Sequence, residues 1–98
     1  MKPLFVVLRT RGPAWDEAQP LEGQADWRAH AGFMDALTEE GFVRLGGPLE
    51  GTRDALLVVE ARDVSEIVAR LADDPWAKNR LLAISQISPW TLRLGTIP

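Results

Sequence analysis

The chain has 98 residues, 46% hydrophobic and 26% charged, with a net charge of −3 at pH 7, and this predicts one small globular domain, residues 1–98. It has no cysteine and one histidine, which excludes disulfides, thiolate nucleophiles and cysteine-based metal sites, and we expect neither a metal nor a cofactor. Scattered arginines and the lack of a long apolar run or a signal-peptide pattern predict a cytoplasmic protein that binds neither nucleic acid nor a membrane.

The chain is expected to begin with a strand over residues 3–9, PLFVVLR, where valine and phenylalanine form a short apolar run. Residues 12–25, GPAWDEAQPLEGQA, contain two prolines and two glycines and predict an irregular connection. A connection of this length is uncommon in a compact domain unless it is a lid or a binding loop, or is partly helical. We therefore expect it to lie beside the functional site, with Trp15 able to cover that site.

A helix is predicted over residues 27–40, with Asp26 as its N-cap and Gly41 as the left-handed residue after its end. The residues of its apolar stripe, at helical spacing, are Trp27, His30, Met34 and Leu37. The only histidine of the chain therefore lies on a face expected to be buried. A histidine in such a position is most often a packed side chain, so a structural role for His30 is the alternative to a catalytic one.

The second half of the chain predicts three more strands and a second helix. The strands are expected at residues 42–49, 54–61 and 82–94, and the helix at residues 64–72, with Val64, Ile67, Val68 and Leu71 on one face. We interpret Gly46-Gly47-Pro48 as a tight turn that ends the second strand. Asp74 before a proline is typical of a helix start, and Pro89 predicts an edge position or a bulge for the last strand.

The order of elements, β-α-β-β-α-β, predicts an α+β ferredoxin-like fold with a four-stranded antiparallel sheet and both helices on one face. Residues 4–8, LFVVL, and 55–59, ALLVV, are apolar at every position. In a sheet with one solvated face, apolar and polar residues would alternate along these strands. Something must therefore cover the second face, and the economical cover is a second copy of the chain, which would form a dimeric α+β barrel.

Three motifs occur in a distinctive order: His30 in the first helix, Gly-Gly-Pro after the second strand and Asp-Pro-Trp after the second helix. Together they resemble the YCII-related family of the dimeric α/β barrel superfamily, over residues 4–94. The resemblance implies a His–Asp dyad in a cleft, carried here by His30 and Asp74. Relatives resemble lyases that remove HCl from chlorinated hydroquinone-type rings, and neighbouring branches of the superfamily include muconolactone isomerases.

If His30 and Asp74 pair, the carboxylate holds one ring nitrogen and leaves the other as a general base. Such a base can remove a proton from a phenol or from a carbon next to a carbonyl without a metal or redox cofactor. We therefore expect a cofactorless lyase or isomerase that acts on a small cyclic or aromatic substrate. The alternative is a non-catalytic dimeric module that binds a small metabolite or serves a partner enzyme, with His30 as packing and Asp74 as a helix cap.

Four further residues are candidates for contact with the substrate: Arg9, Gly47, Pro48 and Trp76. Arg9, like Arg11 beyond it, could meet an anionic group, although a solvated strand end is the simpler interpretation; of the two we keep Arg9. Backbone amides near Gly47 and Pro48 could face the cleft, and Trp76 could either wall a pocket for an aromatic ring or pack in the core. A monooxygenase of the same superfamily is disfavoured because the chain has one histidine and one asparagine, Asn79.

Overall fold

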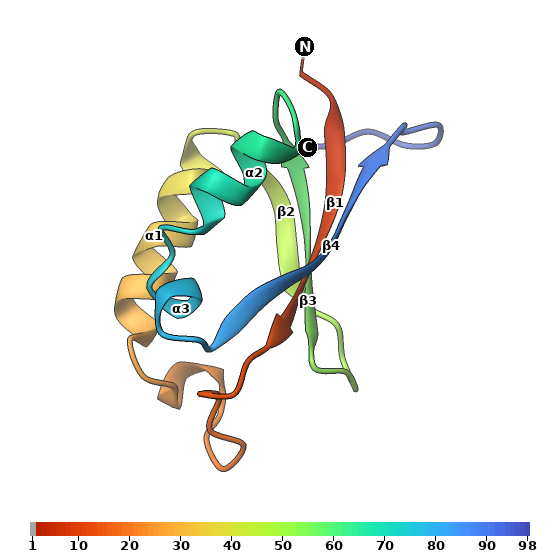
Figure 1. Cartoon of the computed structure of the whole chain (residues 1–98). Helices are drawn as coiled ribbons and strands as arrows, with labels where there is room; N and C mark the ends of the chain where they lie inside the picture. Colours follow the sequence, from red (N-terminus) through yellow and green to blue (C-terminus); the bar gives the residue numbers. More distant parts are fainter. Residues whose placement is uncertain (1) are drawn as a thin grey trace.

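The computed structural model describes residues 2–98 and contains one four-stranded sheet with helices on one of its faces (Figure 1). The strands are β1 (Leu4–Arg11), β2 (Val43–Pro48), β3 (Asp54–Glu60) and β4 (Leu82–Trp90). The helices are α1 (Trp27–Glu39), α2 (Val64–Leu71) and α3 (Pro75–Lys78), preceded by the short 3-10 helix η1 (Leu21–Gly23). The predicted α+β ferredoxin-like order is confirmed, with α3 as a short additional turn. No helix within residues 2–98 is long and apolar enough to cross a bilayer.

The strand order across the sheet is β2-β3-β1-β4, and all three pairings are antiparallel. The last strand, β4, therefore lies at an edge of the sheet. Its register shifts between Leu8, which pairs with Gln86, and Arg9, which pairs with Ile84, so one residue of β4 is left over as a bulge. Both features that Pro89 predicts, an edge position and a bulge, are confirmed.

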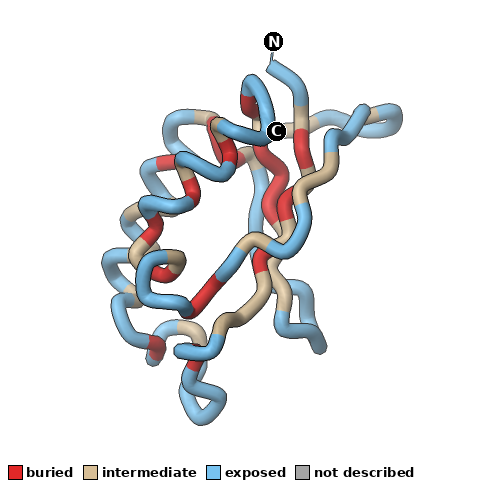
Figure 2. Tube along the Cα trace, in the orientation of Figure 1, coloured by how far each residue is buried: buried red, intermediate tan, exposed pale blue. Residues whose placement is uncertain are grey.

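The main core lies between the sheet and helices α1 and α2 (Figure 2). Its buried members are Phe5, Val7, Leu37, Phe42, Val43, Leu57, Val59, Ala61, Ile67 and Leu71. A second cluster of Trp15, Trp76, Leu81 and Leu82 packs where residues 12–25 meet α3 and the start of β4. On α2, Ile67 and Leu71 are buried, whereas Val64 and Val68 are exposed. Only half of the predicted apolar face of this helix is therefore buried.

The sequence predicts the C-terminal end of α1 more accurately than its N-terminal end. Gly41 has a positive φ of 85°, and the Phe42 amide donates to the Leu37 carbonyl at 3.0 Å, which is the predicted left-handed helix end. Asp26 is the N-cap residue, as predicted, but it has φ 59° and ψ 25° and its side chain caps no helix amide. A capping side chain needs extended backbone, and the left-handed backbone directs this carboxylate to the Asn79 amide instead.

Gly46-Gly47-Pro48 does not form the predicted turn; it is the second half of β2. Gly46 pairs with Leu57 and Pro48 pairs with Ala55 of β3. Because β2 is an edge strand, a proline near its end can be accommodated without breaking the sheet. The chain reverses direction after it, where Gly51 adopts a positive φ of 78°.

The sheet face opposite the helices is also apolar. Residues that pair across neighbouring antiparallel strands share a face, so the registers define this outer face. Its apolar members are Leu4, Val6, Leu8, Leu45, Leu56, Val58 and Trp90. Leu45 is 46% exposed and Trp90 is 39% exposed. Within residues 2–98, no helix covers this face (Figure 1).

Two glycines provide a matched test of backbone crowding. A Cβ at Gly12 would lie 2.3 Å from the Arg80 carbonyl oxygen, whereas a Cβ at Gly32 in α1 would meet nothing within 4 Å. Gly12→Ala should lower the free energy of unfolding by about 1–3 kcal/mol, because backbone must move to admit the methyl group. Gly32→Ala should raise it by up to about 1 kcal/mol, because alanine favours the helix. Urea denaturation of both variants tests this; equal effects would contradict the described packing.

Candidate active site

The site begins with His30 and Asp74, which are 44 residues apart in the sequence. His30 lies in the first full turn of α1, where its amide donates to the Asp26 carbonyl at 2.9 Å. Asp74 is the N-cap of α3. The His30 Nδ1 lies 2.9 Å from each carboxylate oxygen of Asp74. The structure therefore brings together the two residues that the family motif singles out.

Asp74 is fully buried, and its carboxylate has three partners. In addition to His30, it accepts a hydrogen bond from the Trp76 amide at 2.9 Å and pairs with the Arg9 guanidinium at 2.8 Å. Burial raises the pKa of the Asp74 carboxyl, but the His30 hydrogen bond, the Arg9 charge and the Trp76 amide together outweigh it and hold this pKa below its ordinary value. The carboxylate is therefore ionised at neutral pH and acts as an acceptor.

The partners of His30 determine which ring nitrogen is available. Because the ionised Asp74 can only accept, the neutral imidazole carries its proton on Nδ1 and has its lone pair on Nε2. The ring also stacks on the Trp76 indole, with centroids 3.7 Å apart and planes 6° from parallel. The Trp76 indole N–H donates to the Ala25 carbonyl at 2.6 Å, which fixes the stacking partner. The orientation of His30 is thus determined by both a hydrogen bond and an aromatic contact.

His30 lies on the wall of a pocket of about 220 Å³. Three tryptophans share that wall: Trp15, Trp27 and Trp76. The remaining lining residues are Arg11, Leu21, Ala31, Met34, Asp35, Pro48, Arg53, Asp54, Ala55 and Leu82. The pocket is therefore mainly aromatic and aliphatic around the histidine. Its charged groups come from α1 and from the end of β1 and the start of β3, which lie side by side in the antiparallel pair.

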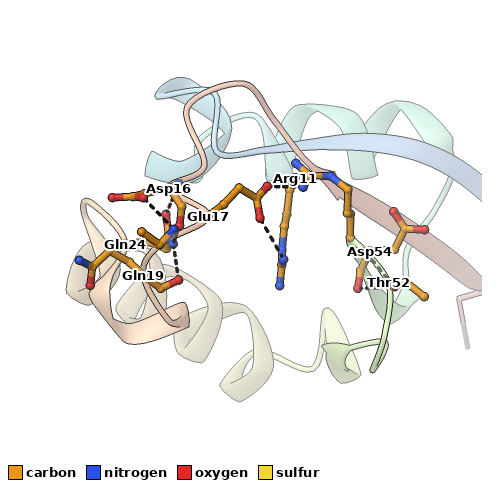
Figure 3. A network of polar contacts seen from close by, with 9 residues as sticks. Arg11, Asp16, Glu17, Gln19, Gln24, Thr52 and Asp54 are labelled. Atoms are coloured by element: carbon orange, nitrogen blue, oxygen red, sulfur yellow. Dashed lines mark hydrogen bonds and ion pairs between the residues drawn. The ribbon is translucent and has the colours of Figure 1, made fainter.

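Residues 12–25 cover one side of this pocket, as predicted. Trp15 is buried, lines the pocket and meets Trp76 edge-on at 5.3 Å between ring centroids. Polar contacts hold the segment in shape: Gln24 bonds to the backbone of Asp16 and of Gln19 (Figure 3).

Glu17 ties the same segment to the sheet. Its carboxylate pairs with Arg53, the residue before β3. It also lies 3.9 Å from Arg11 at the end of β1, and the two side chains point toward each other in Figure 3. All three side chains are at least partly exposed, so these ion pairs contribute little stability. Sequence reasoning missed Arg53 as a pocket residue, because the hairpin that brings Arg53 to the pocket was expected to turn earlier; Arg11, named beside Arg9, does line it.

The four predicted substrate contacts divide into two groups. Pro48 and Trp76 line the pocket. Arg9 does not line the pocket: its side chain is 2% exposed and pairs with Asp74. It is therefore neither a wall residue in contact with substrate nor a solvated residue at a strand end. Gly47 is exposed and paired with Leu56 inside β2, away from the pocket lining. Its backbone amide is part of a strand rather than of an open turn.

A family model for the YCII-related domain matches residues 4–91. The chain belongs to the YCII-related family. A solved structure with this fold is the 5-chloro-2-hydroxyhydroquinone dehydrochlorinase from Burkholderia phenoliruptrix in complex with 2,5-dihydroxybenzoquinone. It is 22% identical to this YCII-related chain, covers 90% of it and 93% of its own length, and superposes with a TM-score of 0.69. Comparison with curated protein sequences gives no significant match.

The lowered pKa of Asp74 in this YCII-related protein predicts acid sensitivity. In the unfolded chain the carboxyl should titrate near its ordinary value of 3.8. Its contribution to stability is therefore complete above this pH and is lost as pH falls through the lower pKa of the folded state. Urea denaturation between about pH 3 and pH 6 should show a steeper loss in the native protein than in Asp74→Asn. Equal pH dependence in the two proteins would contradict the described environment of Asp74.

Proposed function

We propose that this protein is a cofactor-independent lyase or isomerase that acts on a small cyclic or aromatic compound, with His30 as general base and Asp74 as its partner. The observation that carries the proposal is the arrangement of His30. Asp74 holds Nδ1 at 2.9 Å, and the imidazole that presents its other nitrogen lies on the wall of an aromatic pocket. A base whose tautomer is held by a buried carboxylate is suited to proton transfer.

The chemistry follows from this base. His30 Nε2 takes a proton from an acidic hydroxyl or from a carbon next to a carbonyl. The electron pair left on the substrate then expels an anionic leaving group from a neighbouring position, or accepts a proton at a different carbon. The first course is an elimination and the second an isomerisation, and neither requires an oxidant. The imidazolium formed in this step is stabilised by Asp74 and by the stacked face of Trp76.

The size and lining of the pocket support a substrate with a single ring. An apolar cavity of about 150 Å³ can bind benzene, so the pocket of about 220 Å³ has room for a ring with substituents. Tryptophan faces favour a planar ring, and polar substituents can meet the charged groups Arg11, Arg53, Asp35 and Asp54. The dehydrochlorinase with the same fold is bound to a substituted quinone, which is a compound of this kind.

The experiment is a substrate screen of the purified native protein with small cyclic enols, lactones and halogenated hydroquinones. Turnover is followed by absorbance and chloride release, and binding by quenching of tryptophan fluorescence, since three tryptophans line the pocket. We expect at least one compound that both binds and reacts. Binding without reaction across the panel would instead favour a non-catalytic, metabolite-binding module and would overturn the enzymatic proposal.

We also propose that a second copy of the chain covers the outer sheet face. A stable interface of this type buries about 2,000 Å² or more in total, and the apolar outer face of four strands provides a surface for it. Light scattering should therefore give twice the 10.8 kDa chain mass. Val6→Lys on the outer face should produce monomers, whereas Val68→Lys, at an exposed position of α2, should not. A native monomer at micromolar concentration would contradict this proposal.

A further inference from the structure

Arg9 is a buried charged side chain that β1 directs toward the helices. It shares the helix-facing side of the strand with Phe5 and Val7, which belong to the apolar core. It is 2% exposed, and one guanidinium nitrogen, Nη2, lies 2.8 Å from the Asp74 carboxylate. A second, Nη1, faces the Met34 sulfur at 3.8 Å. The third, Nε, is buried and has no hydrogen-bond partner among the described residues.

This environment costs stability. A buried donor without a partner costs about 1–3 kcal/mol, and a thioether sulfur is a weak acceptor. Replacement of a buried ion pair by apolar residues of similar volume is often neutral or stabilising. The packing of the core therefore does not require a cation at this position. Since the buried guanidinium of Arg9 lowers stability and the fold does not need it, we explain its presence by the effect of its positive charge on neighbouring side chains.

The geometry points to Arg9 as a positioning residue: its buried guanidinium balances the Asp74 carboxylate and holds it against His30 Nδ1, so that Nε2 is the basic nitrogen of the ring. This role deepens the proposed function and rests on it, because it concerns the readiness of the same base. Arg9 acts through Asp74 and does not touch the substrate pocket.

The charge balance explains why the guanidinium matters. With Arg9 present, the buried group of Arg9, Asp74 and neutral His30 has no net charge, and protonation of His30 adds one positive charge. Without Arg9, the carboxylate is uncompensated, and a proton on His30 would neutralise it. Removal of Arg9 should therefore make His30 bind its proton more tightly. A more tightly held proton leaves less of the imidazole free to act as a base at a given pH.

A test of Arg9 has to leave the other charged side chains near His30 unchanged. Those that line its pocket are Asp35 on α1, Arg11 at the end of β1, and Arg53 and Asp54 at the start of β3. None of them lies in the Arg9–Asp74 contact. Substitution of Arg9 leaves all four in place, so a change in the titration of His30 reports on Arg9 and Asp74.

The experiment is NMR titration of the histidine ring, which gives one set of signals because the chain has one histidine. The native protein should show the Nδ1–H tautomer above neutral pH. In Arg9→Met, the titration midpoint should move to higher pH by about one unit or more, while Arg9→Lys should restore most of the native behaviour. Arg44→Met removes the arginine of another ion pair of the sheet, Arg44–Glu60, and should leave the midpoint unchanged.

An Arg9→Met protein that folds with the native midpoint and tautomer would overturn the positioning role. If Arg9→Met does not fold, the native protein and Arg9→Lys provide the test. The positioning role is overturned if the native protein shows the Nε2–H tautomer. It is also overturned if Arg9→Lys has a different titration midpoint from the native protein and has lost the Nδ1–H tautomer. The titration needs no substrate, so its failure is distinguishable from a failed substrate screen. Once a substrate is found, Arg9→Met should lower kcat at neutral pH and recover it at higher pH, with little change in KM.

Discussion

Replacement of His30 by glutamine is expected to lower turnover by about 10²- to 10⁴-fold without loss of the fold. Glutamine fills a similar volume on the partly buried face of α1 and can donate to Asp74, but it cannot accept and release a proton. The measurement is kcat on any compound that the native protein converts, together with the thermal unfolding midpoint and quenching of tryptophan fluorescence by the same compound.

The control for this substitution is Arg28→Gln, which changes an exposed residue of the same helix. It should retain native turnover. Binding should survive in His30→Gln, because the tryptophan walls of the pocket remain. A His30→Gln protein with native kcat would refute the role of His30 as general base, whatever the identity of the substrate.

Replacement of Asp74 by alanine is expected to lower the free energy of unfolding by about 3–5 kcal/mol. The substitution would leave Arg9 as an unpaired buried charge, because Arg9 is 2% exposed and Asp74 is its only anionic partner among the described residues. The Trp76 amide at the start of α3 would also lose its cap. For a domain of this size such a loss is a large share of the total stability.

Asp73 provides the matched control, because it is the same residue type one position earlier and is exposed. Asp73→Ala should change stability by no more than about 0.5 kcal/mol. Urea denaturation at neutral pH gives both values. If Asp74→Ala costs less than about 1 kcal/mol, the Arg9–Asp74 pair is not the buried charge pair described above.

The fold was largely predictable because its signals are local. Apolar runs mark β1 and β3, and Gly41 marks the end of α1, so the order of elements follows from short patterns. At two points long-range contacts override the local pattern: the Asp26 side chain does not cap α1, and Gly46 is not in a turn. Asp26 adopts a left-handed backbone and bonds Asn79, which is 53 residues away. Gly46 belongs to a strand because it pairs with Leu57.

The site was predictable only in part. No spacing rule connects His30 with Asp74, and the family motif singled them out. The role of Arg9 depends on which side of β1 faces the helices and on the position of α3, and neither can be derived from the residues around it. The same holds for Arg11 and Arg53, which reach the pocket only through the pairing of β1 with β3.

Deuterium uptake from D₂O is the most direct test of His30 as a general base. The measurement follows, by NMR, exchange at the carbon next to the carbonyl of the lactones and cyclic ketones that bind the protein, and it needs no leaving group. The native protein should accelerate this exchange well above the rate in buffer, and His30→Gln should reduce it to that rate. Exchange at the same rate in the native protein and in His30→Gln, on a compound that binds both, would contradict proton transfer by His30.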